Sequence, residues 1–178
     1  MTNSRALFVN GTVGSGKSAA VEHMGDLLAA VDDSYALLDL DWLRRSEPVP
    51  ESDPFNLHME LVNLAAVAGN YRAAGVRTIV VAGVLEDPTL RPCYEAALAS
   101  DLVVARIEPD LARVTERLRR RHVRSEDAAD LDWHLRRTDE LYGILCQAGA
   151  DDYVVDVEGE TPREVARLIL QQVGWLPR

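Results

Sequence analysis

A glycine-rich turn near the start of the chain separates an apolar run from a helical pattern, and it constrains the fold more than any other feature. The apolar run covers residues 6–9, and apolar side chains recur at helical spacing from residue 19 to residue 28. The turn between them consists of Gly11, Thr12, Val13, Gly14, Ser15, Gly16, Lys17 and Ser18. This spacing is the phosphate-binding loop pattern, in which glycines let backbone N–H groups surround a polyphosphate.

The lysine of this turn is the only lysine in the chain, because 18 of the 19 Lys and Arg residues are arginines. A compact ammonium at this position indicates a role that a planar guanidinium does not fill well. The pattern assigns Lys17 to the β- and γ-phosphates of a nucleotide and the Ser18 hydroxyl to Mg²⁺. A less restrictive alternative is the dinucleotide-binding pattern G-x-G-x-x-A at residues 14–19, with Asp39 as the acid about 20 residues further on. That alternative leaves Gly11 and the Lys-Ser pair unexplained.

Length and charge limit the possible partners. A chain of 178 residues fits one domain, which we expect to span residues 1–178. The net charge of −10 opposes binding to nucleic acid or to an anionic membrane. Two cysteines without metal-ligand spacing indicate a reducing compartment. The first predicted strand leaves no room for a signal peptide and no apolar run reaches membrane-spanning length, so we expect a cytoplasmic protein.

Strand and helix patterns alternate along the rest of the chain. Apolar runs predict four further strands, at residues 35–39, 78–82, 101–107 and 152–157. Helical patterns follow at residues 55–74 and 88–100, from residue 108 onward, and at residues 131–145 and 161–174. This alternation predicts an α/β fold in which a five-stranded parallel sheet carries helices on both faces.

Charged residues follow the second predicted strand. Asp39 ends that strand, and Asp41 and Arg44 come directly after it. Open α/β sheets bind ligands at the carboxyl ends of their strands, so these side chains are candidates for a binding site. The alternative is a solvated turn that contains a charge pair. The third strand ends at Gly83, where many ATPases and GTPases carry an aspartate, and Glu86 is the nearest acid, expected in a loop.

Arginines are concentrated in the helix that begins near residue 108, and two more lie in the next helix. They are Arg113, Arg117, Arg119, Arg120, Arg121, Arg124, Arg136 and Arg137. A short polar segment, residues 125–130, separates the two groups. Arginines on both sides of a short mobile segment predict a lid over phosphates, at about residues 119–137. The alternative is a solvated helix face paired with acids. The isolated His122 and His134 are given no catalytic role.

Over essentially its whole length the chain resembles the small P-loop kinases of the nucleoside-monophosphate-kinase-like group. That group includes adenylate, shikimate, gluconate and adenylylsulfate kinases and chloramphenicol phosphotransferase. The resemblance is carried by the sequences GTVGSGKS, LLDLDWLR, RVTERLRRRHVR and TPREVARLIL. It implies the strand order 2-3-1-4-5, ATP and Mg²⁺ as cofactors, and residues 11–18 as the site of the ATP phosphates.

The resemblance also implies roles for single residues. Asp41 is similar to the carboxylate that accepts the proton of the substrate hydroxyl, and Asp39 to its partner or an indirect metal contact. Arg44 is similar to the arginine of the D-x-D-x-x-R motif that grips an anionic substrate in adenylylsulfate kinases, although Leu40 stands where that motif has a small residue. Among the arginines, Arg117 is similar to the one that packs on adenine and Arg121 to a lid arginine on the phosphates, while Arg124, Arg136 and Arg137 are further lid candidates. Gly83 and the region of about residues 41–74 are expected to contact the acceptor.

Phosphoryl transfer to a hydroxyl benefits from a base such as Asp41, whereas transfer to a phosphate does not. The sequence therefore favours a kinase that acts on a hydroxyl of a small metabolite, nucleoside or antibiotic. The alternatives are a nucleoside monophosphate kinase, a non-catalytic ATP-binding switch and, more remotely, a dinucleotide-dependent dehydrogenase. A guanine-specifying Asn-Lys-x-Asp motif is impossible because the only lysine lies in the glycine-rich turn. The identity of the acceptor and the oligomeric state are not predicted.

Overall fold

The computed structural model describes residues 4–122 and 128–177, and the side chains of residues 121, 122 and 128–130 lie outside that description. Within these ranges the chain forms one parallel sheet of five strands in the order β2-β3-β1-β4-β5. The predicted fold class and the expected strand order are therefore confirmed. The order differs from the 3-2-1-4-5-6 arrangement of dinucleotide-binding folds, which weakens the dehydrogenase alternative.

The elements follow the predicted alternation, with four differences. Two are at boundaries: the fourth strand extends to Pro109, where a helix start was expected, and the sixth helix begins at Ala128, inside the segment 125–130 that was expected to be polar and mobile. The strands are β1 (Arg5–Asn10), β2 (Tyr35–Asp39), β3 (Thr78–Ala82), β4 (Leu102–Pro109) and β5 (Tyr153–Val157). The helices are α1 (Lys17–Ala29), α2 (Leu40–Arg44), α3 (Leu57–Ala73), α4 (Arg91–Leu98), α5 (Leu111–His122), α6 (Ala128–Ala148) and α7 (Pro162–Gln172). The helix expected at residues 88–100 is a 3₁₀ turn, Pro88–Leu90, followed by α4. The charged segment after β2, for which no helix was predicted, forms the short helix α2.

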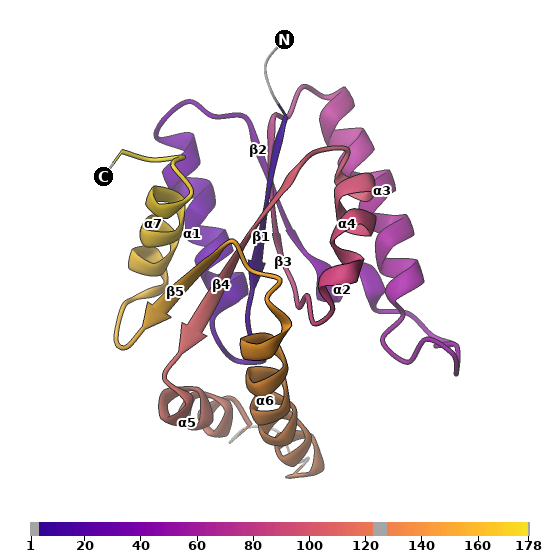
Figure 1. Cartoon of the computed structure of the whole chain (residues 1–178), viewed down its shortest axis with the longest axis vertical. Coiled ribbons are helices and arrows are strands. Elements are labelled where there is room, and N and C mark those ends of the chain that lie inside the picture. The colour runs from indigo at the N-terminus through magenta and orange to yellow at the C-terminus, as the bar shows by residue number, and fades with distance from the viewer. Residues whose placement is uncertain (1–3, 123–127, 178) are drawn as a thin grey trace.

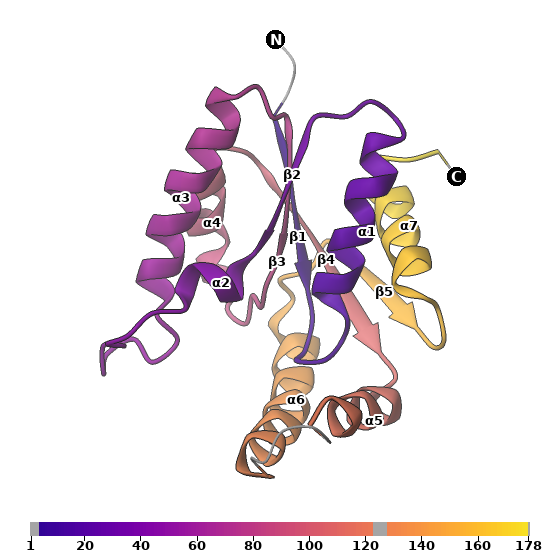
Figure 2. The same ribbon diagram turned by 180° about the vertical axis from the view of Figure 1, so that it is seen from behind.

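Helices cover both faces of the sheet. Helices α1 and α7 lie together on one face and α3 and α4 on the other, as both views show (Figures 1 and 2). The alternation of side chains along each strand supplies both cores. In β1, Leu7 and Val9 pack in the core under α1 and α7, whereas Ala6 and Phe8 pack in the core under α3 and α4. None of the helices in the described ranges combines the length and the apolar content needed to cross a bilayer.

The register of the strands brings three strand ends to one edge of the sheet. Ala82 of β3 lies opposite Val9 of β1 on one side and Asp39 of β2 on the other. Helices α5 and α6 lie beyond this edge, below the arrowheads of β1 and β4 in Figure 1. The segments that follow β1, β2 and β3 therefore meet in the space next to α6, which is where the sequence places its candidate residues.

Candidate functional site

The glycine-rich turn wraps closely around the end of β1. Gly16 has a φ of 99° and is the residue from which α1 begins, so it has no side chain with which to cap the first amides of the helix. A Cβ atom on Gly11 would lie 2.8 Å from the Ser15 hydroxyl oxygen and 3.1 Å from the backbone oxygen of Ile107. A side chain at either position would therefore strain the turn. The turn leaves the N-terminus of α1 facing the cleft, which is an arrangement that favours anions.

The Lys17 ammonium lies across the mouth of this turn. Its Nζ atom donates hydrogen bonds of 2.9 Å to the backbone oxygens of Gly11 and Thr12. Burial lowers the pKa of Lys17 from 10.5 to about 8, and the carboxylates of Asp41 and Asp39 act in the opposite direction. The lysine is thus held on the inner side of the turn by backbone carbonyls, next to two acidic side chains.

A chain of hydrogen bonds connects α1 to the segment after β2. The Ser18 hydroxyl donates to Asp39 Oδ2 at 2.5 Å, and the Asp41 amide donates to Asp39 Oδ1 at 3.0 Å. Asp39 thereby caps α2, a short helix that the sequence patterns did not predict. The cap fixes Asp41 on the first turn of α2 and leaves its side chain 81% exposed. The two acids predicted from the sequence therefore differ in role, because Asp39 is engaged by Ser18 and by the backbone whereas Asp41 extends into solvent.

Asn10, the last residue of β1, connects the two loops on either side of the site. Its Oδ1 atom accepts from the amides of Gly11 at 2.9 Å and Leu85 at 3.0 Å. Its Nδ2 atom donates to the Leu85 oxygen at 3.3 Å and to Asp151 Oδ1 at 3.0 Å. The same Asp151 accepts from Arg106 Nε at 2.7 Å. The buried Asn10 side chain therefore sets the position of the glycine-rich turn relative to the loop after β3.

These segments enclose a cleft of about 750 Å³. The predicted residues that line it are Val13, Gly14, Gly16, Lys17, Ser18, Asp39, Asp41, Arg44, Gly83, Arg117 and Arg137. Thr12 and Ser15 are buried inside the turn. Gly83 has a packing role, because a Cβ atom there would lie 2.6 Å from Leu40 Cδ1 and 2.8 Å from Phe8 Cζ. The structure thus brings together in one cleft the predicted phosphate side and the predicted acceptor side.

The predicted lid arginines take different places. Arg117 donates from Nη1 to the Gly14 oxygen at 2.8 Å, beside the glycine-rich turn. Arg137 of α6 lines the cleft, whereas Arg136 is exposed and does not line it. The side chain of Arg121 and the whole of Arg124 lie outside the described residues, so their predicted roles remain predictions. Helix α6 is held to the turn by Thr138, whose hydroxyl donates to the Val13 oxygen at 3.2 Å.

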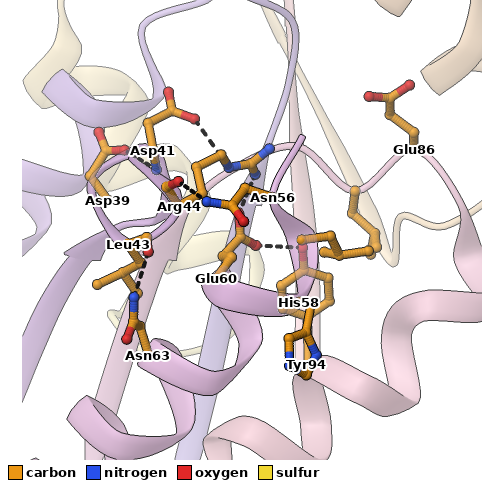
Figure 3. A network of polar contacts seen from close by, with 12 residues as sticks. Asp39, Asp41, Leu43, Arg44, Asn56, His58, Glu60, Asn63, Glu86 and Tyr94 are labelled. Atoms are coloured by element: carbon orange, nitrogen blue, oxygen red, sulfur yellow. Dashed lines mark hydrogen bonds and ion pairs between the residues drawn. The ribbon is translucent and has the colours of Figure 1, made fainter. Parts of the chain in front are cut away.

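An ion pair beneath the acceptor side was not predicted. The guanidinium of Arg44 forms an ion pair with Glu60 of α3, which is fully buried, and Tyr94 of α4 donates to the same carboxylate at 2.7 Å (Figure 3). Burial raises the pKa of Glu60, while the Arg44 charge and the Tyr94 hydroxyl oppose that rise. Burial and the Glu60 charge raise the pKa of Tyr94 as well. The sequence carried one sign of this pair, because Glu60 lies on the same helical stripe as the apolar Leu64 and Ala68.

The backbone around Arg44 is fixed by two amide side chains. Asn56 donates from Nδ2 to the Arg44 oxygen and to the Ser46 hydroxyl, both at 2.7 Å. Asn63 donates to the Leu43 oxygen at 2.7 Å. Helix α2 is therefore attached to α3 through polar contacts at its end, and the Arg44 side chain points back toward Asp41 and Glu60 (Figure 3).

Two aromatic side chains contribute to the lining of the cleft. Phe55, just before α3, and Trp133 of α6 are each 49% exposed and both line the cleft. The guanidinium of Arg137 lies 5.1 Å from the centre of the Phe55 ring. Glu86, expected only as a loop residue, also lines the cleft and forms an ion pair with Arg137. The acceptor side therefore combines apolar surface with paired charges.

The fold together with this cleft defines the class: the chain has the fold of the small P-loop kinases. Solved structures with this fold include the tunicamycin resistance protein of Deinococcus radiodurans, with a TM-score of 0.68, 19% identity and 98% of each chain covered. They also include the shikimate kinase of Acinetobacter baumannii in complex with shikimate, with a TM-score of 0.59, 17% identity, and 97% of this chain and 94% of that chain covered.

A third similar structure contains two ligands, AMPPNP and APS. It is the APS kinase of Mycobacterium tuberculosis in complex with AMPPNP and APS, with a TM-score of 0.60, 16% identity, and 97% of this chain and 99% of that chain covered. No protein-family model matches the chain, and no curated protein matches it by sequence. At these identities the likeness establishes the fold, and it does not assign the substrates of these proteins to this chain.

Proposed function

We propose that this chain is an ATP-dependent phosphotransferase that moves the γ-phosphate of Mg-ATP to a hydroxyl group of a small molecule. One observation carries the proposal: Asp41 presents an exposed carboxylate in the same cleft as the glycine-rich turn. Asp41 is fixed to that turn through Asp39 and Ser18. A carboxylate in this place is useful for an alcohol acceptor, which must lose a proton, and unnecessary for a phosphate acceptor.

The phosphate side fits a nucleotide triphosphate. The N-terminus of α1 and the Lys17 ammonium would hold the β- and γ-phosphates, and Arg117 lies beside the turn to neutralise further charge. Within the described ranges no cluster of three His, Cys, Asp or Glu side chains could hold a metal. Ser18, with Asp39 behind it, would therefore share Mg²⁺ with phosphate oxygens, and the ion would supply charge neutralisation.

In the proposed reaction the acceptor hydroxyl oxygen attacks the γ-phosphorus of ATP. A new P–O bond forms, the bond between the γ-phosphorus and the β–γ bridging oxygen breaks, and ADP leaves. The hydroxyl proton passes to a carboxylate oxygen of Asp41. Such a reaction depends mainly on positioning and charge neutralisation, which Lys17, the N-terminus of α1 and Arg117 would supply.

The experiment is a coupled ADP-release assay over a panel of alcohols, with ATP binding measured separately. We expect acceptor-stimulated ADP release and a loss of about 10²- to 10⁴-fold in kcat for Asp41→Asn, with unchanged affinity for ATP. Lys17→Ala should lose turnover together with ATP affinity. The matched control is Asp156→Asn, which removes an exposed carboxylate of β5 that does not line the cleft. Full activity in Asp41→Asn would contradict the proposed base.

A further inference from the structure

The guanidinium of Arg44 already has two carboxylate partners. Its Nη2 atom pairs with Glu60 and its Nε atom lies 3.8 Å from Asp41 Oδ1. Only 22% of its side chain is exposed, and its buried Nε atom makes no hydrogen bond, so the contact with Asp41 is an ion pair alone. Glu60 is fully buried, so a ligand that drew Arg44 away would leave an unpaired carboxylate in the interior, which is strongly unfavourable. Arg44 is therefore poorly suited to gripping a charged ligand.

The second guanidinium on the acceptor side, that of Arg137, is compensated in the same way. It pairs with Glu86, and its Nη1 atom lies 2.9 Å from Glu140 Oε2. Its side chain is largely buried and its guanidinium lies over the Phe55 ring. Each of these two cations thus has two carboxylate partners among the described residues. Among the described residues, the two guanidiniums of the acceptor side are therefore neutralised by carboxylates, of which Asp41 and Glu86 line the cleft.

This distribution argues against an anionic acceptor. A carboxylate, sulfate or phosphate on the acceptor would meet the carboxylates of Asp41 and Glu86 before it met a cation free to bind it. A cationic acceptor meets a different obstacle, because an ammonium paired with Asp41 would lower the basicity that the proposed proton transfer requires. The half-exposed rings of Phe55 and Trp133 offer apolar contact instead.

We infer that the acceptor is an uncharged alcohol with an aromatic or apolar part, bound between α2 and the rings of Phe55 and Trp133. The inference rests on the proposed function, because it assigns the substrate class of that same cleft. It departs from the expectation, drawn from the D-x-D-x-x-R resemblance, that Arg44 grips an anionic substrate. In this site Arg44 instead points toward both Asp41 and the buried Glu60 and is paired with each of them (Figure 3).

The test measures binding of three matched probes to the whole chain, saturated with Mg²⁺ and a non-hydrolysable ATP analogue. The probes are 4-methylbenzyl alcohol, 4-(hydroxymethyl)benzoate and 4-(hydroxymethyl)benzylamine. We expect the neutral probe to bind at least about tenfold more tightly than either charged probe. Tighter or equal binding of a charged probe overturns the inference, and so does failure of all three to bind. The ATP analogue is titrated first, and its failure to bind would instead count against the proposed function.

Variants of the compensating acids provide a second measurement. Glu60→Gln keeps an acceptor for the Tyr94 hydroxyl but removes the charge that neutralises Arg44, so the benzoate probe should gain at least about tenfold in affinity while the neutral probe changes little. Glu86→Gln, at a less buried position, should act in the same way through Arg137 and decides the matter if Glu60→Gln does not fold. Glu95→Gln is the control, because Glu95 pairs with Arg91 outside the cleft lining. Unchanged benzoate binding in the folded cleft variants would overturn the inference.

Discussion

At the scale of single residues, the cleft depends on a few side chains whose surroundings change their chemistry. Lys17 is the clearest case, because burial lowers its pKa to about 8 while two backbone oxygens hold its Nζ atom. A triphosphate favours the ammonium form, so nucleotide binding and protonation of Lys17 should support each other. The glycine-rich turn is therefore expected to bind nucleotide in a pH-dependent manner above neutrality.

The first prediction concerns this dependence. In the nucleotide-free protein, Lys17 loses its proton as the pH rises through about 8, whereas in the complex with nucleotide it keeps its proton. The affinity for an ATP analogue should therefore be about tenfold lower at about pH 9 than at pH 7. Calorimetric titration in buffers of different ionisation enthalpy measures both the affinity and the uptake of a proton. Lys17→Met is the control: it should bind the ATP analogue more weakly, with an affinity that does not change between pH 7 and about pH 9. An equal slope in Lys17→Met would assign the dependence to another group.

The sequence predicted those site residues that lie close together along the chain. The glycine-rich turn and the acids after β2 each form a local pattern, so their place at one edge of the sheet followed from the fold. Glu60 of α3 and Tyr94 of α4 lie 34 residues apart in the sequence, so no local pattern encodes their pairing. One partner of each cleft arginine, Glu60 for Arg44 and Glu86 for Arg137, likewise comes from another segment of the chain. The charge of the acceptor side could therefore not be read from the sequence.

At the scale of elements, the least expected feature is α2. Five residues are too few for a clear helical period, so no helix was predicted here. The structure shows what stabilises it: the Asp39 cap at its start, and Leu40, which is fully buried against the α3 and α4 side of the sheet. An aspartate directly before an apolar residue was the available signal. The position of Asp41 depends on this small helix.

The second prediction tests the contact that holds α2. Gly83→Ala places a Cβ atom 2.6 Å from Leu40 Cδ1, so we expect a loss of about 1–3 kcal/mol in the free energy of unfolding and a lower kcat through displaced Asp41. Urea unfolding followed by circular dichroism measures the first effect. The control is Gly69→Ala in α3, where an added Cβ atom has open space. That variant should gain up to about 1 kcal/mol. Equal stability of the two variants would contradict the packing role of Gly83.

At the scale of the whole molecule, the alternation of strand and helix patterns was enough to predict the layers and the parallel sheet. The strand order came from the family resemblance. The lid was predicted from the positions of arginines, and the structure describes only part of it. Arg137 and Thr138 of α6 border the site, whereas residues 123–127 lie outside the described ranges. The lid therefore stays a prediction.

The third prediction therefore concerns the response of the whole chain to its nucleotide. An ATP analogue with Mg²⁺ at about 100 times its Kd should add about 2.7 kcal/mol to the free energy of unfolding, which corresponds to roughly 5–10 °C in Tm for a chain of this size. Calorimetric scans with and without nucleotide measure the shift. Lys17→Met should lose most of it, whereas Asp156→Asn should keep it. A shift of equal size in Lys17→Met would place the nucleotide elsewhere.

Asn10 has a consequence for how chains of this fold can diverge. One amide at the end of the central strand holds both the turn that would bind the donor and the loop that borders the acceptor. The distance between the nucleotide and the acceptor would then be set by the end of β1, and not by the lengths of the two loops. Insertions in either loop could change what is recognised while the phosphorus and the attacking oxygen keep their separation.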